Sequence, residues 1–322
     1  MTITKNKIHN PIVLQRADPW VCKHTDGKYY FTGSVPGYQS IELRRGDSLN
    51  NLEDGEIKTI WQAPDSGPMK NLIWAPEIHF IDSVWYVYFA ASDEENGRSR
   101  EHHHRMFVIA NENSDPFEGE WEVKGQVKTA FDSFSLDATV FENDSKLYYV
   151  WAQQDPRIPG NSNLYISEMA NPWTLKGPQI ILSIPEYDWE KSGFWVNEGP
   201  AVIKRYGKII ITYSGSATDE NYAMGLLWAD ADDDLLDGGA WHKSPEPVFA
   251  SSETNRQFGP GHNSFTVDEF GNDILIYHAR PEKNKEGDPL DNPNRHAIAQ
   301  EFTWGSDGLP IFGEPVANDK EV

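Results

Sequence analysis

The sequence predicts an all-β protein folded as a five-bladed β-propeller, and three observations support this fold class. One strand–turn–strand pattern occurs five times along the chain. A polar residue opens each copy, and these residues recur at intervals of 59, 60, 61 and 64 positions: Asp18, Glu77, Asp137, Glu198 and His262. A near-constant period with strand content is typical of repeat architectures. No low-complexity linker interrupts the pattern, so residues 1–322 are expected to form a single propeller domain.

Each copy combines a strand, a short turn and a second strand rich in apolar and aromatic residues. The five copies span residues 17–34, 75–90, 136–151, 197–214 and 261–279. In the fourth copy, the connection at residues 205–208 contains Gly207, which tolerates positive φ, and the run 209–214 is apolar on both faces. Such a run indicates a strand that is buried on both sides. A β-sandwich is the alternative, but a sandwich gives no reason for an acidic residue to recur at a fixed spacing.

The two ends of the chain are expected to meet in the last blade. Residues 10–14 have the character of a strand, and residues 296–304 offer a matching partner near the other end. Pairing between these segments would close the ring of blades.

The radial arrangement of a propeller makes the opening residues chemically meaningful, because equivalent positions on the innermost strands converge on the central axis. Three of these residues are acids, namely Asp18, Asp137 and Glu198. A pair of carboxylates across a pocket is the equipment of glycoside hydrolysis. Since blades one and four are not neighbours in a ring of five, Asp18 and Glu198 are expected to face each other at ~6.5–9.5 Å with room for a water molecule. Purely structural roles, in which the acids tie loops to one another, are the alternative.

The neighbours of each acid suggest its role. A general acid must stay protonated near neutral pH, so its pKa must be raised. Phe194 and Trp195 precede Glu198 in the sequence and are expected to shield it from water, and the charge of Asp137 would raise its pKa further. Asp18 would then be the ionised base.

Further residues are expected to bind the substrate. Trp74 is placed to stack on a sugar ring, and Glu77 would extend the acid network. Either Arg280 or Arg295 would hydrogen-bond a sugar hydroxyl group, and the sequence does not decide between them.

No cofactor is expected to be required, but an ion is considered at two places. His262 follows the glycine-rich turn Gly259-Pro260-Gly261 and is expected to bind substrate or to hold a water molecule on the axis. A metal ion held by His262 through water, such as a structural calcium ion, is the alternative, although calcium prefers oxygen ligands. The three consecutive histidines at 102–104 are expected to lie in a solvated loop, because adjacent side chains on a strand point to opposite faces.

Composition narrows the range of partners and locations. The chain has 50 acidic and 28 basic residues and a formal net charge of −22, which disfavours nucleic acid and anionic membranes and favours a neutral substrate. The aromatic content of 12 % suits both a core and the flat faces of sugars. The N-terminus lacks the apolar segment of a secretory signal and no run approaches membrane-spanning length, so a cytoplasmic location is expected.

Five motifs together resemble glycoside hydrolase family 43, in the family's order and over nearly the whole chain. They are Arg16-Ala17-Asp18-Pro19, Trp74-Ala75-Pro76-Glu77, Ser135-Leu136-Asp137-Ala138, Asn197-Glu198-Gly199-Pro200 and Gly259-Pro260-Gly261-His262-Asn263. The resemblance implies a five-bladed propeller and an inverting mechanism. It implies Asp18 as general base, Glu198 as general acid and Asp137 as modulator of the pKa of the acid. It also implies that His262 lies beneath the pocket near a water molecule or a calcium ion.

Within that family the chain looks most similar to α-L-arabinofuranosidases that act on arabinan or arabino-oligosaccharides, on the stretches at residues 38–45 and 74–79. The expected partner is therefore a neutral, arabinose-containing saccharide, and release of single arabinose units from chain ends is the expected activity. A β-xylosidase and an endo-arabinanase remain alternatives within the family. A sugar-binding propeller without catalysis is the alternative from another functional class.

Overall fold

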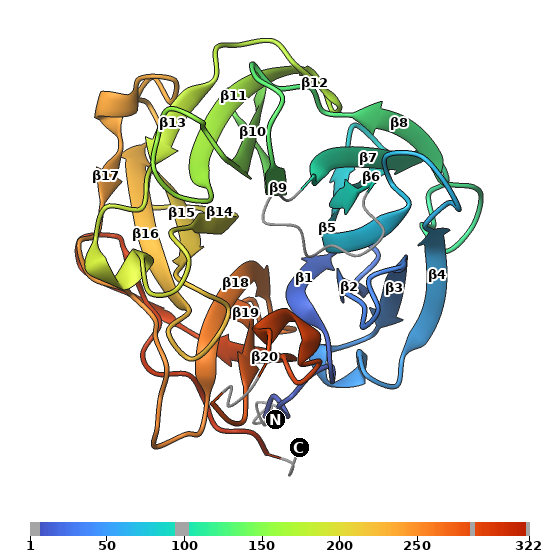
Figure 1. The fold of residues 1–322 in the computed structure, drawn as a ribbon. Helices are drawn as coiled ribbons and strands as arrows, with labels where there is room; N and C mark the ends of the chain where they lie inside the picture. Colours follow the sequence, from blue (N-terminus) through green and yellow to red (C-terminus); the bar gives the residue numbers. More distant parts are fainter. Residues whose placement is uncertain (1–6, 94–102, 284–286, 320–322) are drawn as a thin grey trace.

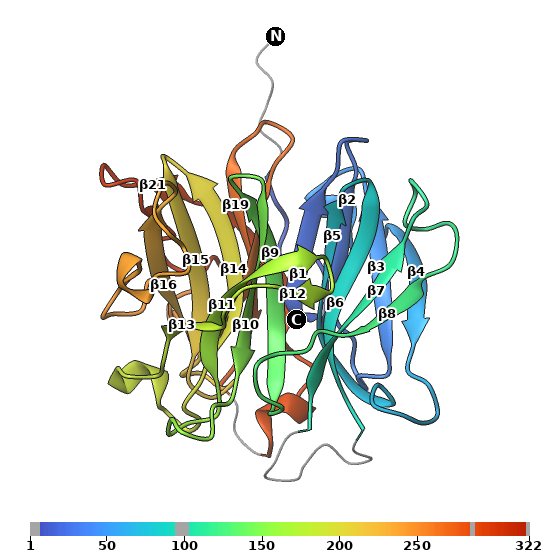
Figure 2. The same ribbon diagram turned by 90° about the horizontal axis from the view of Figure 1, so that it is seen from above.

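The computed structural model describes residues 7–93, 103–283 and 287–319. Over these residues the sheets are arranged radially about one axis, with β1, β5, β9, β14 and β18 nearest the centre (Figure 1). Figure 2 shows the blades from the side, with their strands running roughly along the axis. The five-bladed β-propeller predicted from the repeat is confirmed.

Each blade is an antiparallel meander that runs outwards from the axis. Blade 1 contains β1 (Ala17–Lys23), β2 (Tyr29–Ser34), β3 (Ser40–Gly46) and β4 (Glu56–Gln62). Blade 2 contains β5 (Asn71–Ile81), β6 (Val84–Ser92), β7 (Arg105–Asn111) and β8 (Glu122–Gln126). Blade 3 contains β9 (Ser135–Asn143), β10 (Lys146–Gln153), β11 (Asn163–Asn171), β12 (Thr174–Leu175) and β13 (Ile180–Ser183).

The last two blades follow the same plan. Blade 4 contains β14 (Asn197–Arg205), β15 (Lys208–Gly215), β16 (Ala223–Asp230) and β17 (His242–Lys243). Blade 5 contains β18 (Phe258–Val267), β19 (Asp273–Arg280) and β20 (His296–Glu301), and β21 (Thr303–Trp304) pairs separately with β22 (Pro310–Ile311). Four short 3-10 helices lie in the described connections: η1 (Leu49–Asn51), η2 (Asp188–Glu190), η3 (Gly238–Ala240) and η4 (Pro289–Asp291). Among the described residues, no helix has the length and apolar character needed to cross a membrane.

The N-terminal segment seals the last blade, as the sequence predicts. Val13 forms an antiparallel bridge with Ala297, and the Ile12 N–H donates to the Ala297 carbonyl at 2.8 Å. The buried side chain of Asn10 donates to the Ala299 carbonyl at 2.8 Å and accepts from the Ala299 N–H at 2.9 Å. These bonds tie the two ends of the chain together across blade 5.

The innermost strand of every blade carries a residue with positive φ where its ladder with the second strand is interrupted. These residues are Asp18 (φ 54°), Ala75 (45°), Asp137 (50°), Gly199 (56°) and His262 (43°). An interruption of this kind is a β-bulge, which bends the strand and re-aims a side chain. The true repeat position is therefore occupied by Ala75 in blade 2 and Gly199 in blade 4. The prediction that Glu77 and Glu198 are equivalent to the other opening residues is therefore wrong: Glu77 lies two residues after the repeat position and Glu198 lies one residue before it.

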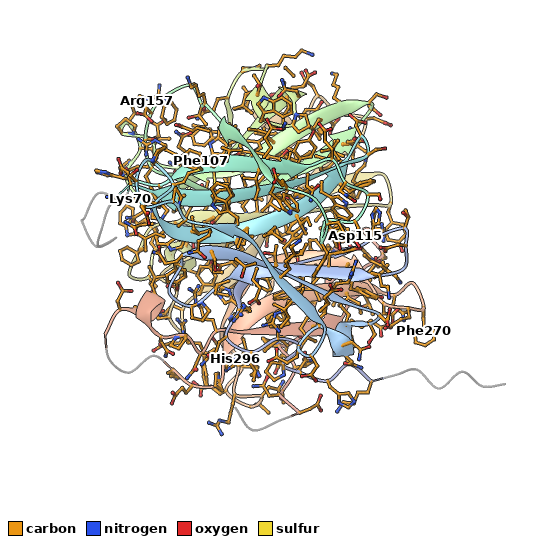
Figure 3. The ribbon with its side chains drawn as sticks, turned by 90° about the vertical axis from the view of Figure 1, so that its right-hand side faces the viewer. Lys70, Phe107, Asp115, Arg157, Phe270 and His296 are labelled. Carbon is orange, nitrogen blue, oxygen red and sulfur yellow. The ribbon has the colours of Figure 1, made fainter. Side chains whose placement is uncertain are left out.

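Aromatic side chains fill the space between neighbouring blades. Figure 3 shows the blades from the side with their side chains. Trp85, Trp151 and Tyr149 are among the largest fully buried side chains. Burying a large apolar side chain stabilises a fold by about 1.5–3 kcal/mol, so these rings hold neighbouring blades together. In the same view Arg157 lies at one end of the propeller and Phe270 lies at the opposite end.

Candidate functional site

A cavity of about 140 Å³ opens at one end of the axis, and its wall comes from two kinds of segment. Residues in or just before the innermost strands supply one part: Asp18, Trp74, Phe134, Leu136, Asp137, Phe194, Val196, Glu198 and His262. The connections between the second and third strands of the blades supply the other part: Tyr38, Asn161, Ser216, Thr218, Tyr222, Asp288, Leu290 and Arg295. The three predicted acids therefore line one cavity, although they lie far apart in the sequence.

Asp18 lies in the bulge of β1 and is held by polar neighbours on several sides. Its Oδ1 is 3.3 Å from His262 Nδ1, 3.4 Å from His278 Nδ1 and 3.5 Å from Arg295 Nη1. Its Oδ2 accepts a hydrogen bond from the Ser34 hydroxyl group. Burial alone would raise the pKa of Asp18, but His262, Arg295 and His278 outweigh burial and hold it well below its usual range. Asp18 is thus ionised at neutral pH.

The two histidines beside Asp18 are held in their neutral forms. Burial lowers the pKa of His278 to about 3, and its Nδ1 accepts the Asp18 backbone N–H at 3.1 Å. Burial also lowers the pKa of His262, whose Nδ1 lies between Asp18 and Asp137, 3.3 and 3.7 Å from their carboxylate oxygens. Since both imidazoles are neutral near pH 7, Arg295 is the permanent cation beside Asp18.

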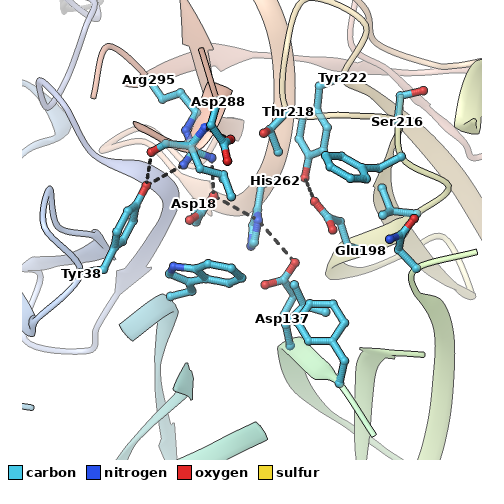
Figure 4. Close-up of a pocket in the computed structure, with 17 residues that line it drawn as sticks. Asp18, Tyr38, Asp137, Glu198, Ser216, Thr218, Tyr222, His262, Asp288 and Arg295 are labelled. Carbon is cyan, nitrogen blue, oxygen red and sulfur yellow. Dashed lines mark hydrogen bonds and ion pairs between the residues drawn. The ribbon is translucent and has the colours of Figure 1, made fainter. Parts of the chain in front are cut away.

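Glu198 faces the cavity from the ladder of β14, on the other side of His262 from Asp18 in the view of Figure 4. Its Oε1 accepts a hydrogen bond from the Tyr222 hydroxyl group at 2.9 Å. Burial and the charge of Asp18 raise the pKa of Glu198 to about 7. A carboxyl group with this pKa is partly protonated at neutral pH, as a general acid must be.

Asp137 lies in the bulge of β9 and accepts the Gly199 N–H at 3.1 Å. Burial and the charges of Glu198 and Asp18 raise its pKa well above the usual value. Asp137 and Glu198 therefore disfavour each other's ionisation, so at most one of them readily carries a charge beside ionised Asp18. The sequence predicted that Asp137 would raise the pKa of Glu198, whereas the charge that raises it is that of Asp18, and Glu198 in turn raises the pKa of Asp137.

The aromatic residues before Glu198 do not shield it in the way the sequence suggested. Phe194 and Trp195 are 52 % and 43 % exposed, and Phe194 alone of the two lines the cavity. Burial of Glu198 comes instead from the cavity wall around it, to which Tyr222 contributes. The expected result, a raised pKa, is found with a different cause.

The remaining predicted residues divide between the cavity and its surroundings. Trp74 lines the cavity and stacks on His104, with ring centroids 3.7 Å apart. Arg295 lines it too, and its Nη2 donates to the Tyr38 hydroxyl at 3.2 Å. Tyr38 in turn donates to the Leu290 carbonyl at 2.9 Å, so this wall is tied to η4.

Two residues predicted to bind substrate lie outside the lining. Glu77 is buried, and its Oε2 lies 3.1 Å from Nε2 of its neighbour His79. Arg280 is buried behind the wall, where its guanidinium group donates to the carbonyls of Thr218 and Pro289. Arg280 thus fixes two connections that line the cavity, and Arg295 is the arginine that faces it.

The sequence analysis left open an ion held by His262 through water, and the side chains around His262 offer such an ion few direct oxygen ligands. Calcium takes six to eight oxygen ligands. His262 Nδ1 instead faces two carboxylates, one of which also lies 3.5 Å from Arg295. Over the part of the chain that the structure describes, no group of three or more His, Cys, Asp and Glu side chains is arranged to hold a metal. Of the three consecutive histidines, His102 lies outside the described residues, His103 is about half exposed and His104 is buried under Trp74.

A second hollow, of about 630 Å³, opens at the other end of the axis. Its lining includes Trp20, Val140, Val202 and Phe265, from the later parts of the innermost strands. The catalytic acids predicted from the sequence all lie at the first cavity, so the larger hollow is not the candidate site.

Sequence reasoning missed the contribution of Tyr38, Thr218, Tyr222, Asp288 and Leu290 to the wall. All of them lie in connections between second and third strands. In an antiparallel meander, these connections emerge at the end of the blade where the innermost strand begins. The repeat therefore contained the signal, because the acids mark that same end.

Comparisons with known proteins agree with this geometry. The model of the family described as Glycosyl hydrolases family 43 matches residues 8–310. An extracellular exo-α-(1→5)-L-arabinofuranosidase of Streptomyces avermitilis is 50 % identical over 96 % of this chain and 64 % of its own length. The enzyme of the same name from Streptomyces chartreusis is 53 % identical over 87 % of this chain and 84 % of its own length. The crystal structure of an α-L-arabinofuranosidase from Lactobacillus brevis superposes with a TM-score of 0.95 at 56 % identity, covering 97 % of this chain and 98 % of that one.

The names of these relatives correct one prediction. Both Streptomyces proteins are named extracellular, which points to secretion and overturns the cytoplasmic location expected from the N-terminal residues. The chain spans 64 % of the length of the Streptomyces avermitilis relative.

Proposed function

The chain belongs to glycosyl hydrolases family 43, and from this premise we propose that it is an inverting exo-α-L-arabinofuranosidase. Its substrate would be arabinan or an arabino-oligosaccharide, from which it releases arabinose. One observation carries the proposal: three carboxyl groups share one cavity, and their pKa values are driven apart, with Asp18 low and Glu198 raised to about 7. Two acids with opposite protonation states are what glycoside hydrolysis requires.

The proposed reaction assigns a role to each acid. A water molecule attacks the anomeric carbon and gives a proton to the Asp18 carboxylate. The glycosidic C–O bond breaks, and the leaving oxygen takes the proton of Glu198. Attack from the side opposite the leaving group inverts the configuration at the anomeric carbon. In this scheme Asp137, which accepts the Gly199 N–H beside Glu198, acts as modulator of the acid.

The form of the cavity supports action at a chain end. The hydrogen bonds from Arg295 to Tyr38 and from Tyr38 to Leu290 join one side of the wall to η4. Trp74 and Phe134 supply apolar surface for the C–H face of a sugar. A cavity of about 140 Å³ with such walls suits a terminal sugar unit better than the middle of a polysaccharide. Both Streptomyces relatives are named exo-acting enzymes, which supports the same direction.

The test is an incubation of purified protein with p-nitrophenyl α-L-arabinofuranoside, p-nitrophenyl β-D-xyloside and α-1,5-linked arabino-oligosaccharides. Release of arabinose from the arabinosides is expected, and NMR of the first-formed product should show the inverted anomer. On the arabino-oligosaccharides, whose leaving group needs a proton, Glu198→Gln and Asp18→Asn should each lower kcat/KM by at least ~10²-fold without unfolding the protein. Preference for the xyloside, internal cleavage or retained configuration would contradict the corresponding part of the proposal. The absence of any release would favour a sugar-binding propeller.

A further inference from the structure

Tyr222 is a buried residue that contacts the candidate acid directly. It lies immediately before β16, in the connection from β15, and is 1 % exposed. Its hydroxyl group donates to Glu198 Oε1 at 2.9 Å, and its ring stacks on His278 with centroids 5.6 Å apart and planes 10° apart (Figure 4 shows the contact with Glu198). The phenol therefore has one position, and that position is at the carboxyl group of the acid.

The glycine-rich start of β18, just before His262, leaves the space that this ring occupies. A Cβ atom at Gly261 would lie 2.6 and 2.7 Å from two ring carbons of Tyr222 and 2.8 Å from Ser214 Oγ. Gly259 has φ +60°, and a Cβ there would lie 2.2 Å from the carbonyl oxygen of Asp219, in the same connection as Tyr222. Real Cβ atoms do not approach other atoms this closely. The two glycines are thus required by the position of Tyr222 and its connection.

We propose that Tyr222 is a positioning residue for the acid: it fixes Glu198 Oε1 as the acceptor, so that Oε2 carries the proton and faces the leaving oxygen. The inference rests on the proposed glycoside hydrolase function. A protonated carboxyl group has one hydroxyl oxygen and one carbonyl-type oxygen. Because the phenol donates to Oε1, the acidic proton belongs on Oε2. Gly259 and Gly261 serve the reaction indirectly, since they admit the ring that makes this selection.

The charged and titratable groups around Glu198 determine how the phenol affects its protonation. Asp18 on β1 raises the pKa of Glu198 along with burial, and Arg295 lowers it. On β9, the pKa of Asp137 is raised by burial and by the charges of Glu198 and Asp18. The hydrogen bond from Tyr222 lowers the pKa of Glu198 because it favours the ionised form. The pKa of Tyr222 itself is raised far above its usual value by burial and by Glu198, so the phenol remains a donor at every working pH.

The experiment compares Tyr222→Phe with wild type on two substrates of different leaving-group ability. A sugar leaving group, as in α-1,5-arabinobiose, needs the proton of Glu198. A 2,4-dinitrophenyl leaving group departs as an anion and needs little protonation. We expect kcat/KM to fall about 10- to 100-fold for arabinobiose and less than about threefold for the aryl arabinofuranoside, the range of a hydrogen bond to a charged group. The alkaline limb of the pH profile for arabinobiose should move to higher pH, because loss of the phenol raises the pKa of Glu198.

Two further variants separate positioning from packing. Tyr206→Phe removes the hydroxyl of a tyrosine that is 68 % exposed on the β14–β15 turn, and it should change neither rate nor pH profile. Gly261→Ala should displace the Tyr222 ring and show the same selective loss on arabinobiose. Adding Tyr222→Phe to Gly261→Ala should then cost little more, because both changes disrupt one contact.

Equal losses of Tyr222→Phe on both substrates, with an unmoved alkaline limb, would overturn the proposal and leave Tyr222 as a packing residue. Additive effects of Tyr222→Phe and Gly261→Ala would refute the role of Gly261 in admitting the Tyr222 ring. A wild-type protein that cleaves neither substrate would instead refute the proposed function on which the inference rests.

Discussion

The buried carboxylate of Glu190 offers a direct test of how the acid-bearing strand is held. Glu190 ends η2 and is completely buried. Its Oε1 accepts from Asn197 Nδ2 at 2.8 Å, Tyr213 OH at 2.9 Å and Lys243 Nζ at 2.8 Å. Its Oε2 accepts two backbone N–H groups at 2.8 Å, those of residues 186 and 187. Asn197 directly precedes Glu198, so this network anchors the start of β14.

Replacing Glu190 by Ala should strongly destabilise the protein. An unsatisfied buried donor costs about 1–3 kcal/mol, and five donors lose their acceptor. Relaxation and entering water offset part of that sum, and breaking a buried ion pair typically costs about 3–5 kcal/mol. We expect a loss of this size in the free energy of unfolding. With an m-value of about 3 kcal/mol/M, the urea midpoint followed by tryptophan fluorescence would fall by roughly 1–1.7 M.

The matched control for this variant is Glu186→Gln. Glu186 is the second carboxylate near Lys243, at 3.4 Å, but its side chain is 50 % exposed. An exposed ion pair contributes little, so the control should change stability by less than about 0.5 kcal/mol. If Glu190→Ala lies within about 1 kcal/mol of wild type, or if Glu186→Gln costs as much, the network does not hold β14 as argued.

Three further predictions concern the cavity. In wild type, kcat/KM for an unactivated arabinoside should fall as the pH rises through about 7, because Glu198 loses its proton there. The activity should persist to low pH because Asp18 stays ionised. A profile that is flat to pH 9 would contradict this. Arg295→Met should move both the acidic and the alkaline limb of the pH profile to higher pH, because Arg295 lowers the pKa of Asp18 and of Glu198. Limbs that do not move would show that the charge of Arg295 does not affect these two pKa values. Gly199→Ala should lower the free energy of unfolding by about 1–2 kcal/mol, because Gly199 has a positive φ. It should also lower kcat, because the added Cβ would lie 3.0 Å from Cγ of His262. Gly207→Ala, with positive φ and open space around it, should cost stability alone; equal kcat values for the two variants would refute the steric argument.

The sequence predicts the architecture and the convergence of the acids because both depend on the repeat. Strand periodicity locates the blades, and radial geometry then brings Asp18, Asp137 and Glu198 to one cavity. The residues that line the rest of the cavity are predicted less well. The sequence did not decide whether Arg280 or Arg295 faces the cavity. The answer depends on tertiary contacts: the guanidinium group of Arg280 donates to backbone carbonyls behind the wall, whereas that of Arg295 lies beside Asp18. Tyr222 escaped prediction because its contact with Glu198 depends on a connection whose path the strand pattern does not determine.

The offset between repeat position and acid in blade 4 explains how a symmetric fold builds an asymmetric site. Asp18 and Asp137 occupy the bulge of their strands, where the positive φ aims them at His262 on the axis. In blade 4 this position is Gly199, and the absence of a side chain leaves room for the imidazole of His262. Glu198 lies one residue earlier, within the regular ladder opposite Ser214, and therefore leaves its strand in a different direction from the two aspartates. A carboxylate at position 199 would crowd His262. Moving the acid by one residue instead places it beside Tyr222, on the other side of His262 from Asp18 in the view of Figure 4.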